Sequence, residues 1–300
     1  MRVRISVQTF FDGNQREPLG DHVGGVARIL EELGFTGIWV AEHVVTFEHY
    51  DPAFKYPYSA DGMPPEMMSH SGMLEPFATL TYMAAHSRRL RLGTGIAILP
   101  QRNPVYFAKS GAALDQLSGG RFVAGVGLGW SPQEFAATNT PWEHRGARTA
   151  DYVRVLKTLW TDETSEFHGR FYDLPRCIHL PKPIQRPHPP LYFGGESGPA
   201  LRRVAAFGQG WFGLQLSPDD LRPRLAALEE ELGRHGRALD EIDLVTSPAL
   251  GATCDRDLIA RYRDAGVAEV VVVCVANDLD SFRRSAEALA SELIETQGRM

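Results

Sequence analysis

Short runs of apolar, β-branched residues alternate along the chain with longer stretches in which apolar residues recur at helical spacing. Residues 37–41 are almost entirely apolar, which is typical of a strand that is covered on both faces in a parallel sheet. Residues 22–33 carry apolar side chains three and four positions apart, and Gly34 follows where a helix is expected to end. The same alternation continues along the rest of the chain and predicts an α/β fold.

Strands and helices are expected in strict alternation, eight of each. The strands are predicted at residues 3–7, 37–41, 90–98, 121–127, 190–193, 211–214, 242–247 and 269–275. The helices are predicted at residues 22–33, 76–86, 104–117, 145–160, 199–207, 218–233, 256–265 and 281–295. Right-handed βα units repeated in this way over 300 residues predict a (β/α)₈ TIM barrel that forms a single domain across residues 1–300. The alternative is a doubly wound open sheet, which usually has fewer strands.

Two insertions interrupt the alternation, one after the second strand and one between the fourth helix and the fifth strand. The first, residues 43–74, is rich in aromatic residues, Pro and Met, and it follows the carboxyl end of a strand, where barrel active sites are built. We therefore expect it to form a lid or a pocket wall rather than an interface flap. The second, residues 161–189, alternates in polarity over 166–174 and predicts a hairpin.

Charge and composition narrow the class of partner. The formal net charge is −6 and no basic run is present, so the chain is a poor candidate for nucleic-acid binding, which needs clustered Lys and Arg. No apolar stretch approaches the ~20 residues of a membrane span, and no signal-like run begins the chain, so we expect a cytoplasmic protein. The three cysteines are far apart and the ten histidines show no H-E-x-x-H spacing, so neither a disulfide framework nor a metal site is expected. The expected partner is a small-molecule substrate.

The end of the second strand carries an acid/base pair, Glu42 beside His43. Histidine titrates near neutral pH and can give or take a proton, although a purely structural His43 is the alternative. Glu42 and Glu75 are a candidate pair of carboxylates. Such a pair hydrolyses glycosides when the two groups are correctly spaced.

A glycine-rich turn follows the fifth strand. Gly194 and Gly195 end that strand, and Ser197 and Gly198 open the next helix. Free backbone N–H groups at such a helix terminus suit a phosphate, and the late βα loops of barrels often hold one. The alternative is a tight turn without a ligand. No set of converging cations is visible in the sequence, which argues against a substrate that carries its own phosphate.

The fourth strand ends in the run G-V-G-L-G at residues 125–129. It is a weak dinucleotide fingerprint, because the sixth position holds neither Gly nor Ala and no Rossmann context surrounds it. We interpret these glycines as positions where the backbone approaches a flat ligand closely. Ser131 and Glu134 then form the pattern of a capping box that opens a helix.

Several motifs occur in an order that resembles the luciferase-like monooxygenase superfamily. They are L-G-T-G at 92–95, R-N-P at 102–104, L-D-Q-L-S-G-G-R-F at 114–122, G-V-G-L-G-W at 125–130 with E-F at 134–135, R-G at 145–146, R-P-H-P-P at 186–190, G-G at 194–195 and G-W at 210–211. The residues of the fourth-strand motif and of the R-P-H-P-P motif are most similar to those of the F420-dependent oxidoreductase branch. This resemblance implies coenzyme F420, a deazaflavin that carries a hydride. The alternative is FMN in an oxygen-using monooxygenase with a partner reductase, and a third is a flavin-binding protein without catalysis.

The resemblance also assigns expected roles to residues. His43 matches a histidine close to the cofactor ring and is the expected acid/base, with Glu42 orienting it. The expected cofactor contacts are the strand-three bulge Gly95, Ile96 and Ala97, the strand-four edge Gly127, Leu128, Gly129 and Trp130, and the phosphate cradle Gly194, Gly195, Ser197 and Gly198. Family members often hold a non-prolyl cis peptide in that bulge and often form homodimers. The apolar loop after His43 points to an uncharged or partly aromatic substrate.

Overall fold

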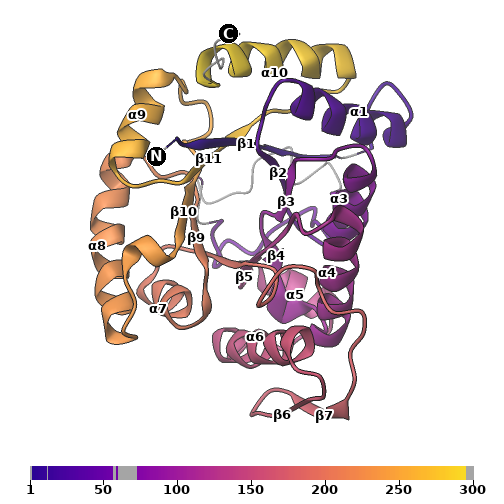
Figure 1. Cartoon of the computed structure of the whole chain (residues 1–300), viewed down its shortest axis with the longest axis vertical. Coiled ribbons are helices and arrows are strands. Elements are labelled where there is room, and N and C mark those ends of the chain that lie inside the picture. The colour runs from indigo at the N-terminus through magenta and orange to yellow at the C-terminus, as the bar shows by residue number, and fades with distance from the viewer. Residues whose placement is uncertain (1, 12, 57–58, 60–72, 295–300) are drawn as a thin grey trace.

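Parallel strands close into a barrel at the centre of the molecule (Figure 1). The computed structural model describes residues 2–11, 13–56, 59 and 73–294. Within these residues the barrel strands are β1 (Arg4–Thr9), β2 (Gly37–Val40), β3 (Arg91–Thr94), β5 (Phe122–Gly127), β8 (Leu191–Gly194), β9 (Gly210–Gly213), β10 (Asp243–Thr246) and β11 (Glu269–Val273). Neighbouring strands pair in parallel, and the pairing of β3 with β5 closes the ring. The predicted (β/α)₈ barrel is confirmed.

Helices cover the outside of the barrel (Figure 1). They are α1 (Leu19–Glu32), α3 (Pro76–Ala85), α4 (Pro104–Ser118), α6 (Arg145–Thr161), α7 (Gly198–Phe207), α8 (Pro218–Arg234), α9 (Arg256–Asp264) and α10 (Leu279–Leu293). Local signals fix their ends: the Asn103 side chain accepts hydrogen bonds from the first amides of α4, and Gly119 ends that helix at φ 70°. Among the described residues, no helix is both long enough and apolar enough to cross a membrane.

The observed elements differ from the predicted ones mainly in three places. The strand expected over 90–98 is wrong as a continuous element, because it is divided into β3 and β4 (Ala97–Ile98) by a cis peptide between Gly95 and Ile96. The other two differences are the added 3₁₀ turns η1 (Leu99–Gln101) and η2 (Leu239–Glu241). The helix predicted from Ser131 and Glu134 is present as the short α5 (Pro132–Ala137).

Both insertions occur where the sequence places them. The expected hairpin is confirmed as the antiparallel pair β6 (Ser165–His168) and β7 (Asp173–Cys177), which extends beyond α6 (Figure 1). Of the first insertion, residues 57–58 and 60–72 lie outside the described residues, including the methionines at 63, 67 and 68.

The barrel interior is filled by Trp39 and sealed at its amino-terminal end by paired charges. The Trp39 Nε1–H donates to a carboxylate oxygen of Glu269 at 2.8 Å, and Glu269 is fully buried. Arg4 and Arg91, which begin their strands, both pair with the Glu269 carboxylate. A buried charge is tolerated only when it is paired, and the Glu269 carboxylate is fully engaged by protein groups at this end of the barrel. The ligand site is therefore expected at the opposite, carboxyl end.

Gly125 of β5 tests how tightly the strands are packed. A Cβ at this position would lie 2.0 Å from the carbonyl oxygen of Thr94, and backbone cannot move aside cheaply. We expect Gly125→Ala to lower the free energy of unfolding by at least the upper end of the ~1–3 kcal/mol typical of overpacking. Gly233→Ala is the matched control, because that exposed position in α8 has open space and the helix gains ~0.5–1 kcal/mol. Urea unfolding of both variants measures the difference, and a Gly125→Ala protein as stable as wild type would contradict this packing.

Candidate active site

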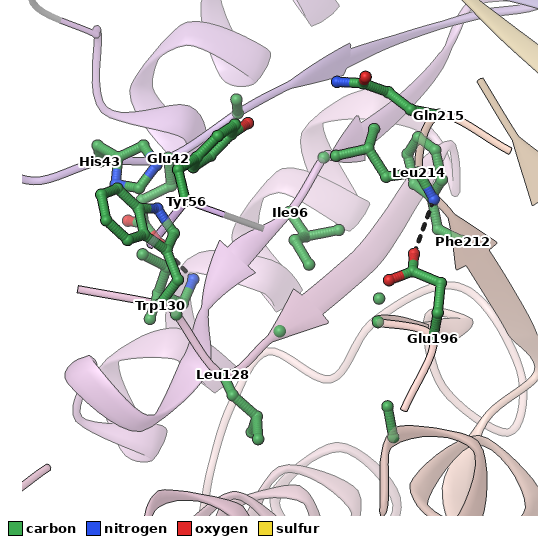
Figure 2. Close-up of a pocket in the computed structure, with 18 of the residues that line it drawn as sticks. Glu42, His43, Tyr56, Ile96, Leu128, Trp130, Glu196, Phe212, Leu214 and Gln215 are labelled. Carbon is green, nitrogen blue, oxygen red and sulfur yellow. Dashed lines mark hydrogen bonds between the residues drawn. The ribbon is translucent and has the colours of Figure 1, made fainter. Parts of the chain in front are cut away.

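A cavity of about 600 Å³ opens at the carboxyl ends of the barrel strands (Figure 2). It is lined by the ends of β1, β2, β5, β8 and β9 and by the loops that follow them. Its volume lies within the range of sites that bind cofactors and drug-sized ligands. The cavity therefore lies at the end of the barrel where the sequence predicts the site.

The side chain of Ile96 forms the floor of the cavity. It projects between the side of the cavity that carries His43 and Trp130 and the side that carries Glu196 (Figure 2). The Gly95 carbonyl at its base accepts a hydrogen bond of 3.0 Å from Nε2 of Gln8, which fixes the bulge to β1. The bulge expected here is confirmed.

The glycines around the floor make room for protein side chains. A Cβ at Gly127 or at Gly194 would lie 2.3 Å from Cδ1 of Ile96, and a Cβ at Gly129 would lie 2.9 Å from Ile98. Gly127 thus makes room for Ile96 and Gly129 for Ile98, and both glycines line the cavity. The expectation that the backbone of the 125–129 run approaches a ligand stays a prediction.

The residues expected to contact a cofactor are almost all brought together. Those that line the cavity are Gly95, Ile96, Gly127, Leu128, Gly129, Trp130, Gly194, Gly195 and Ser197. Ala97 is fully buried in β4, and neither Ala97 nor Gly198 is part of the lining.

His43 lines the cavity and is held by Glu134 from α5. Nδ1 of His43 lies 3.1 Å from Oε2 of Glu134, and the other carboxylate oxygen accepts the backbone N–H of Val44 at 2.8 Å. Glu134 is 1% exposed, whereas 12% of the His43 side chain is exposed. The expected capping box is only half formed: Oγ of Ser131 accepts from the Glu134 backbone N–H, but the Glu134 carboxylate turns to His43.

Glu42 does not hold the histidine, which corrects the expected arrangement. Its carboxylate accepts the backbone N–H of Ile98 at 2.7 Å and pairs with Arg102. Arg102 also bridges to Glu75 at 2.7 Å. Glu42 therefore ties the end of β2 to β4. Both carboxylates of the glycosidase pair considered above are engaged by the Arg102 guanidinium, although Glu42 still lines the cavity.

Aromatic side chains form the wall beside His43. Trp130 packs against Tyr50 and Tyr56, with ring centroids 5.2 and 5.3 Å apart. Burial raises the pKa of Tyr56 to about 12, so its hydroxyl stays neutral. The amide of Gln133, next to Glu134, accepts from the Asp51 N–H and donates to a neighbouring carbonyl, which fastens this loop to α5. The described part of the first insertion is thus a pocket wall.

Two arginines converge on the phosphate cradle, and the sequence analysis missed them. Arg145 begins α6 and Arg203 lies on α7, and both line the cavity. Burial lowers the pKa of Arg145, and burial with the nearby charges of Arg145 and Arg202 lowers that of Arg203. Among the described residues no carboxylate pairs with either guanidinium, and Nε of Arg145 is buried without a hydrogen-bond partner. The Arg145 guanidinium lies over the Trp142 ring, with Cζ 3.6 Å from the ring centroid. The two arginines therefore bring positive charge to this side of the cavity without a carboxylate partner among the described residues.

The backbone part of the cradle is smaller than expected. Ser197 precedes α7, and its side chain does not cap the helix. Pro199 has no N–H, and the Ala200 N–H already donates to the carbonyl oxygen of Ser197. Neither Pro199 nor Ala200 therefore offers a free backbone N–H at the start of α7. Arg145 belongs to the R-G motif at 145–146. This motif could have indicated a positive charge at the site, but it was used only as evidence of family resemblance.

Comparisons with known proteins identify the family. The profile described as luciferase-like monooxygenase matches residues 1–298. An uncharacterized protein of Mycobacterium tuberculosis is 31% identical over 250 residues, which cover 82% of this chain and 83% of that protein. The FMNH2-dependent dimethylsulfone monooxygenase of Pseudomonas putida is 39% identical over 143 residues, which cover 44% of this chain and 39% of that enzyme.

Solved structures share the fold across the whole chain. Monooxygenase RslO1 from Streptomyces bottropensis has a TM-score of 0.78 at 18% identity, with 97% of this chain and 98% of that chain covered. The coenzyme F420-dependent tetrahydromethanopterin reductase from Methanopyrus kandleri has a TM-score of 0.73 at 17% identity, with 98% and 99% covered. Family members are oxidoreductases or monooxygenases that act on small molecules, and some depend on F420 and others on flavin. With a profile match over nearly its full length and a barrel that carries the family's motifs at one cavity, the chain belongs to the luciferase-like monooxygenase family.

Proposed function

We propose that the protein is an oxidoreductase that transfers a hydride between coenzyme F420 and a small organic substrate. The observation that carries this proposal is the placement of two unpaired arginines and one histidine around a single apolar floor. Arg145 and Arg203 are suited to a phosphate, Ile96 to a flat ring, and His43 to the atom that exchanges a proton. The similarity of the fourth-strand and R-P-H-P-P motifs to the F420-dependent branch favours the deazaflavin.

The residues present fit such a cofactor. The N-terminus of α7, the Ser197 hydroxyl and the two guanidiniums form a cationic corner for the phosphate of its tail. Ile96, Phe212 and Leu214 present apolar surface for a ring, and the Glu196 carboxylate beside them accepts the Leu214 N–H at 3.0 Å (Figure 2). Bound there, the deazaflavin supplies the hydride chemistry, while the protein supplies position and electrostatics.

His43 is the proposed catalytic residue for the proton that accompanies hydride transfer. Its ring lines the cavity beside the aromatic wall, and its Nδ1 is already engaged by Glu134. Its second ring nitrogen is therefore the one that exchanges the proton with the substrate. Trp130, Tyr50 and Tyr56 exclude water on this side and favour an uncharged or partly aromatic substrate.

An FMN-dependent monooxygenase is the second candidate, and the relative from Pseudomonas putida named for FMNH2 favours it. The cationic corner suits the FMN phosphate as well. The preference between F420 and FMN therefore depends on which ring system the apolar part of the cavity binds more tightly. Consumption of oxygen on addition of reduced FMN distinguishes this candidate. A protein that binds either cofactor without hydride exchange or oxygen consumption would be the non-catalytic alternative.

Cofactor binding is the first test. We titrate the purified protein with F420 and with FMN, and we expect the tighter binding for F420. Each of Arg145→Gln and Arg203→Gln is expected to raise the Kd for F420 by about 10- to 100-fold, the worth of a hydrogen bond to a charged group. Arg154→Gln is the matched control, because Arg154 lies on α6 but pairs with Asp151. Wild-type affinity in both cavity variants would contradict the phosphate corner, and tighter binding of FMN would favour the monooxygenase.

The role of His43 is tested by His43→Ala. We expect kcat to fall by about 10²- to 10⁴-fold, the usual contribution of general acid–base catalysis, while the Kd for the cofactor stays close to wild type. Steady-state kinetics and the same titration measure the two quantities. Wild-type turnover in this variant would remove His43 from the mechanism.

We also propose that the protein forms a homodimer through α3 and α4, which lie side by side on the barrel (Figure 1). Their outer faces expose large apolar side chains, namely Tyr82 at 44%, Tyr106 at 77% and Leu117 at 69%. We expect a dimer in sedimentation velocity and a shift to monomer in Tyr106→Glu, because a charge in an apolar interface is costly. Ala226→Glu on α8 is the control and should remain dimeric. A monomeric wild type would contradict the proposal.

A further inference from the structure

The Glu134 carboxylate bonds two donors from adjacent residues of one loop. Its Oε1 accepts the Val44 backbone N–H at 2.8 Å, and its Oε2 lies 3.1 Å from Nδ1 of His43. An ionised carboxylate only accepts hydrogen bonds, so the hydrogen of this second contact belongs to the imidazole. The second nitrogen of a neutral imidazole is then without a hydrogen.

We propose that Glu134 is a positioning residue that holds His43 in the tautomer protonated on Nδ1, so that an unprotonated Nε2 faces the cavity. The ring lines the cavity, and no described residue forms a hydrogen bond with Nε2. His43 therefore begins the reaction as a proton acceptor, and the imidazolium it becomes lies against the Glu134 carboxylate. The catalytic use of this tautomer rests on the proposed function, whereas the tautomer itself is a property of the protein alone.

The other polar groups around the ring do not compete for Nδ1. The Glu42 carboxylate is engaged by the Ile98 N–H and Arg102. Burial, followed by the nearby charge of Glu134, raises the pKa of Tyr50, which stays neutral. Tyr56 is neutral for the same reason of burial, and Trp130 contacts the ring only through its edge, with centroids 6.1 Å apart. Lys55 lines the cavity from the same loop, and as an ammonium it can only donate hydrogen bonds.

Because of the Val44 N–H, the substitution Glu134→Gln is expected to change the tautomer of His43. In Glu134→Gln the amide oxygen must accept the Val44 N–H, because turning the NH₂ group toward it would oppose two donors in a buried place. The NH₂ group is then directed at Nδ1 of His43. Nδ1 must become the acceptor, and the hydrogen moves to Nε2. The side chain keeps its size and both contacts, so packing is conserved while the tautomer is inverted.

The tautomer is read directly by ¹⁵N NMR of the histidine ring nitrogens in the protein without cofactor. The His43 signals are assigned by their loss in His43→Gln. We expect a protonated Nδ1 and an unprotonated Nε2 in wild type, and the reverse in Glu134→Gln. Asp115→Asn is the matched control, since Asp115 is a fully buried carboxylate on α4 that accepts backbone N–H groups far from the cavity. Its His43 signals should match wild type.

Each result decides the proposal. A wild-type His43 protonated on Nε2 overturns it even if the Glu134→Gln protein fails to fold, and so does the same tautomer in wild type and Glu134→Gln. With hydride transfer established, Glu134→Gln should lower kcat by about 10²- to 10⁴-fold. In the serine-protease triad, the equivalent change from carboxylate to amide presents the wrong tautomer and costs about 10⁴-fold. An inverted tautomer with wild-type kcat would overturn the role of Nε2. An enzyme without hydride transfer contradicts the proposed function and leaves the NMR result standing.

Discussion

One indole in the middle of the barrel sets the conditions for the rest of the structure. Trp39 packs closely against β3. A Cβ at Gly93 would lie 2.4 Å from the indole ring, and a Cβ at Gly95 would lie 2.9 Å from the Cβ of Trp39. The indole is fixed from below by the buried Glu269 and flanked by Phe212, with ring centroids 5.1 Å apart. β3 therefore carries glycine where a regular strand would carry branched residues. The strand ends at Thr94, and the bulge follows it. The bulge turns Ile96 into the cavity, so the floor of the site follows from the packing of the core.

The walls of the site follow from the loops that cover this floor, and α5 organises one of them. Adjacent residues of this short helix act on one loop: Gln133 fastens its backbone, and Glu134 engages His43 and the residue after it. On the opposite side, Arg145 and Arg203 come from two different helices and repel each other across the cradle. The site therefore has one part whose charges are satisfied within the protein and one part whose charges are not. The unsatisfied part is where binding free energy from an anion is available.

The fold was predictable because each βα unit is encoded locally. Apolar periodicity locates strands and helices, and a regular order of such units leaves few topologies. His43 and the glycine-rich turns were predictable for the same reason, since the carboxyl end of a strand is a position that can be counted along the chain. The partner of His43 was not, because Glu134 is 91 positions away and its direction depends on how α5 lies against the loop. Glu42 was the nearer carboxylate in sequence, yet successive residues at a strand end point to different sides, and it turned to Arg102. The glycines at 127 and 194 were located correctly, but the side chain that needs them, Ile96, comes from the bulge between β3 and β4.

The cationic corner has a consequence for how such a barrel diversifies. Two guanidiniums and a helix terminus hold a phosphate by its charge and its oxygens, and they do not sense what the phosphate is attached to. In the complex that we propose, the ring system is held elsewhere, by Ile96, Phe212 and the aromatic loop that line the cavity. Anchoring and discrimination therefore reside in different segments of the chain and can change independently. Substitutions in one short loop can exchange the ring that is preferred while the grip on the tail persists, so the scaffold can pass from one cofactor to another through intermediates that never lose binding altogether.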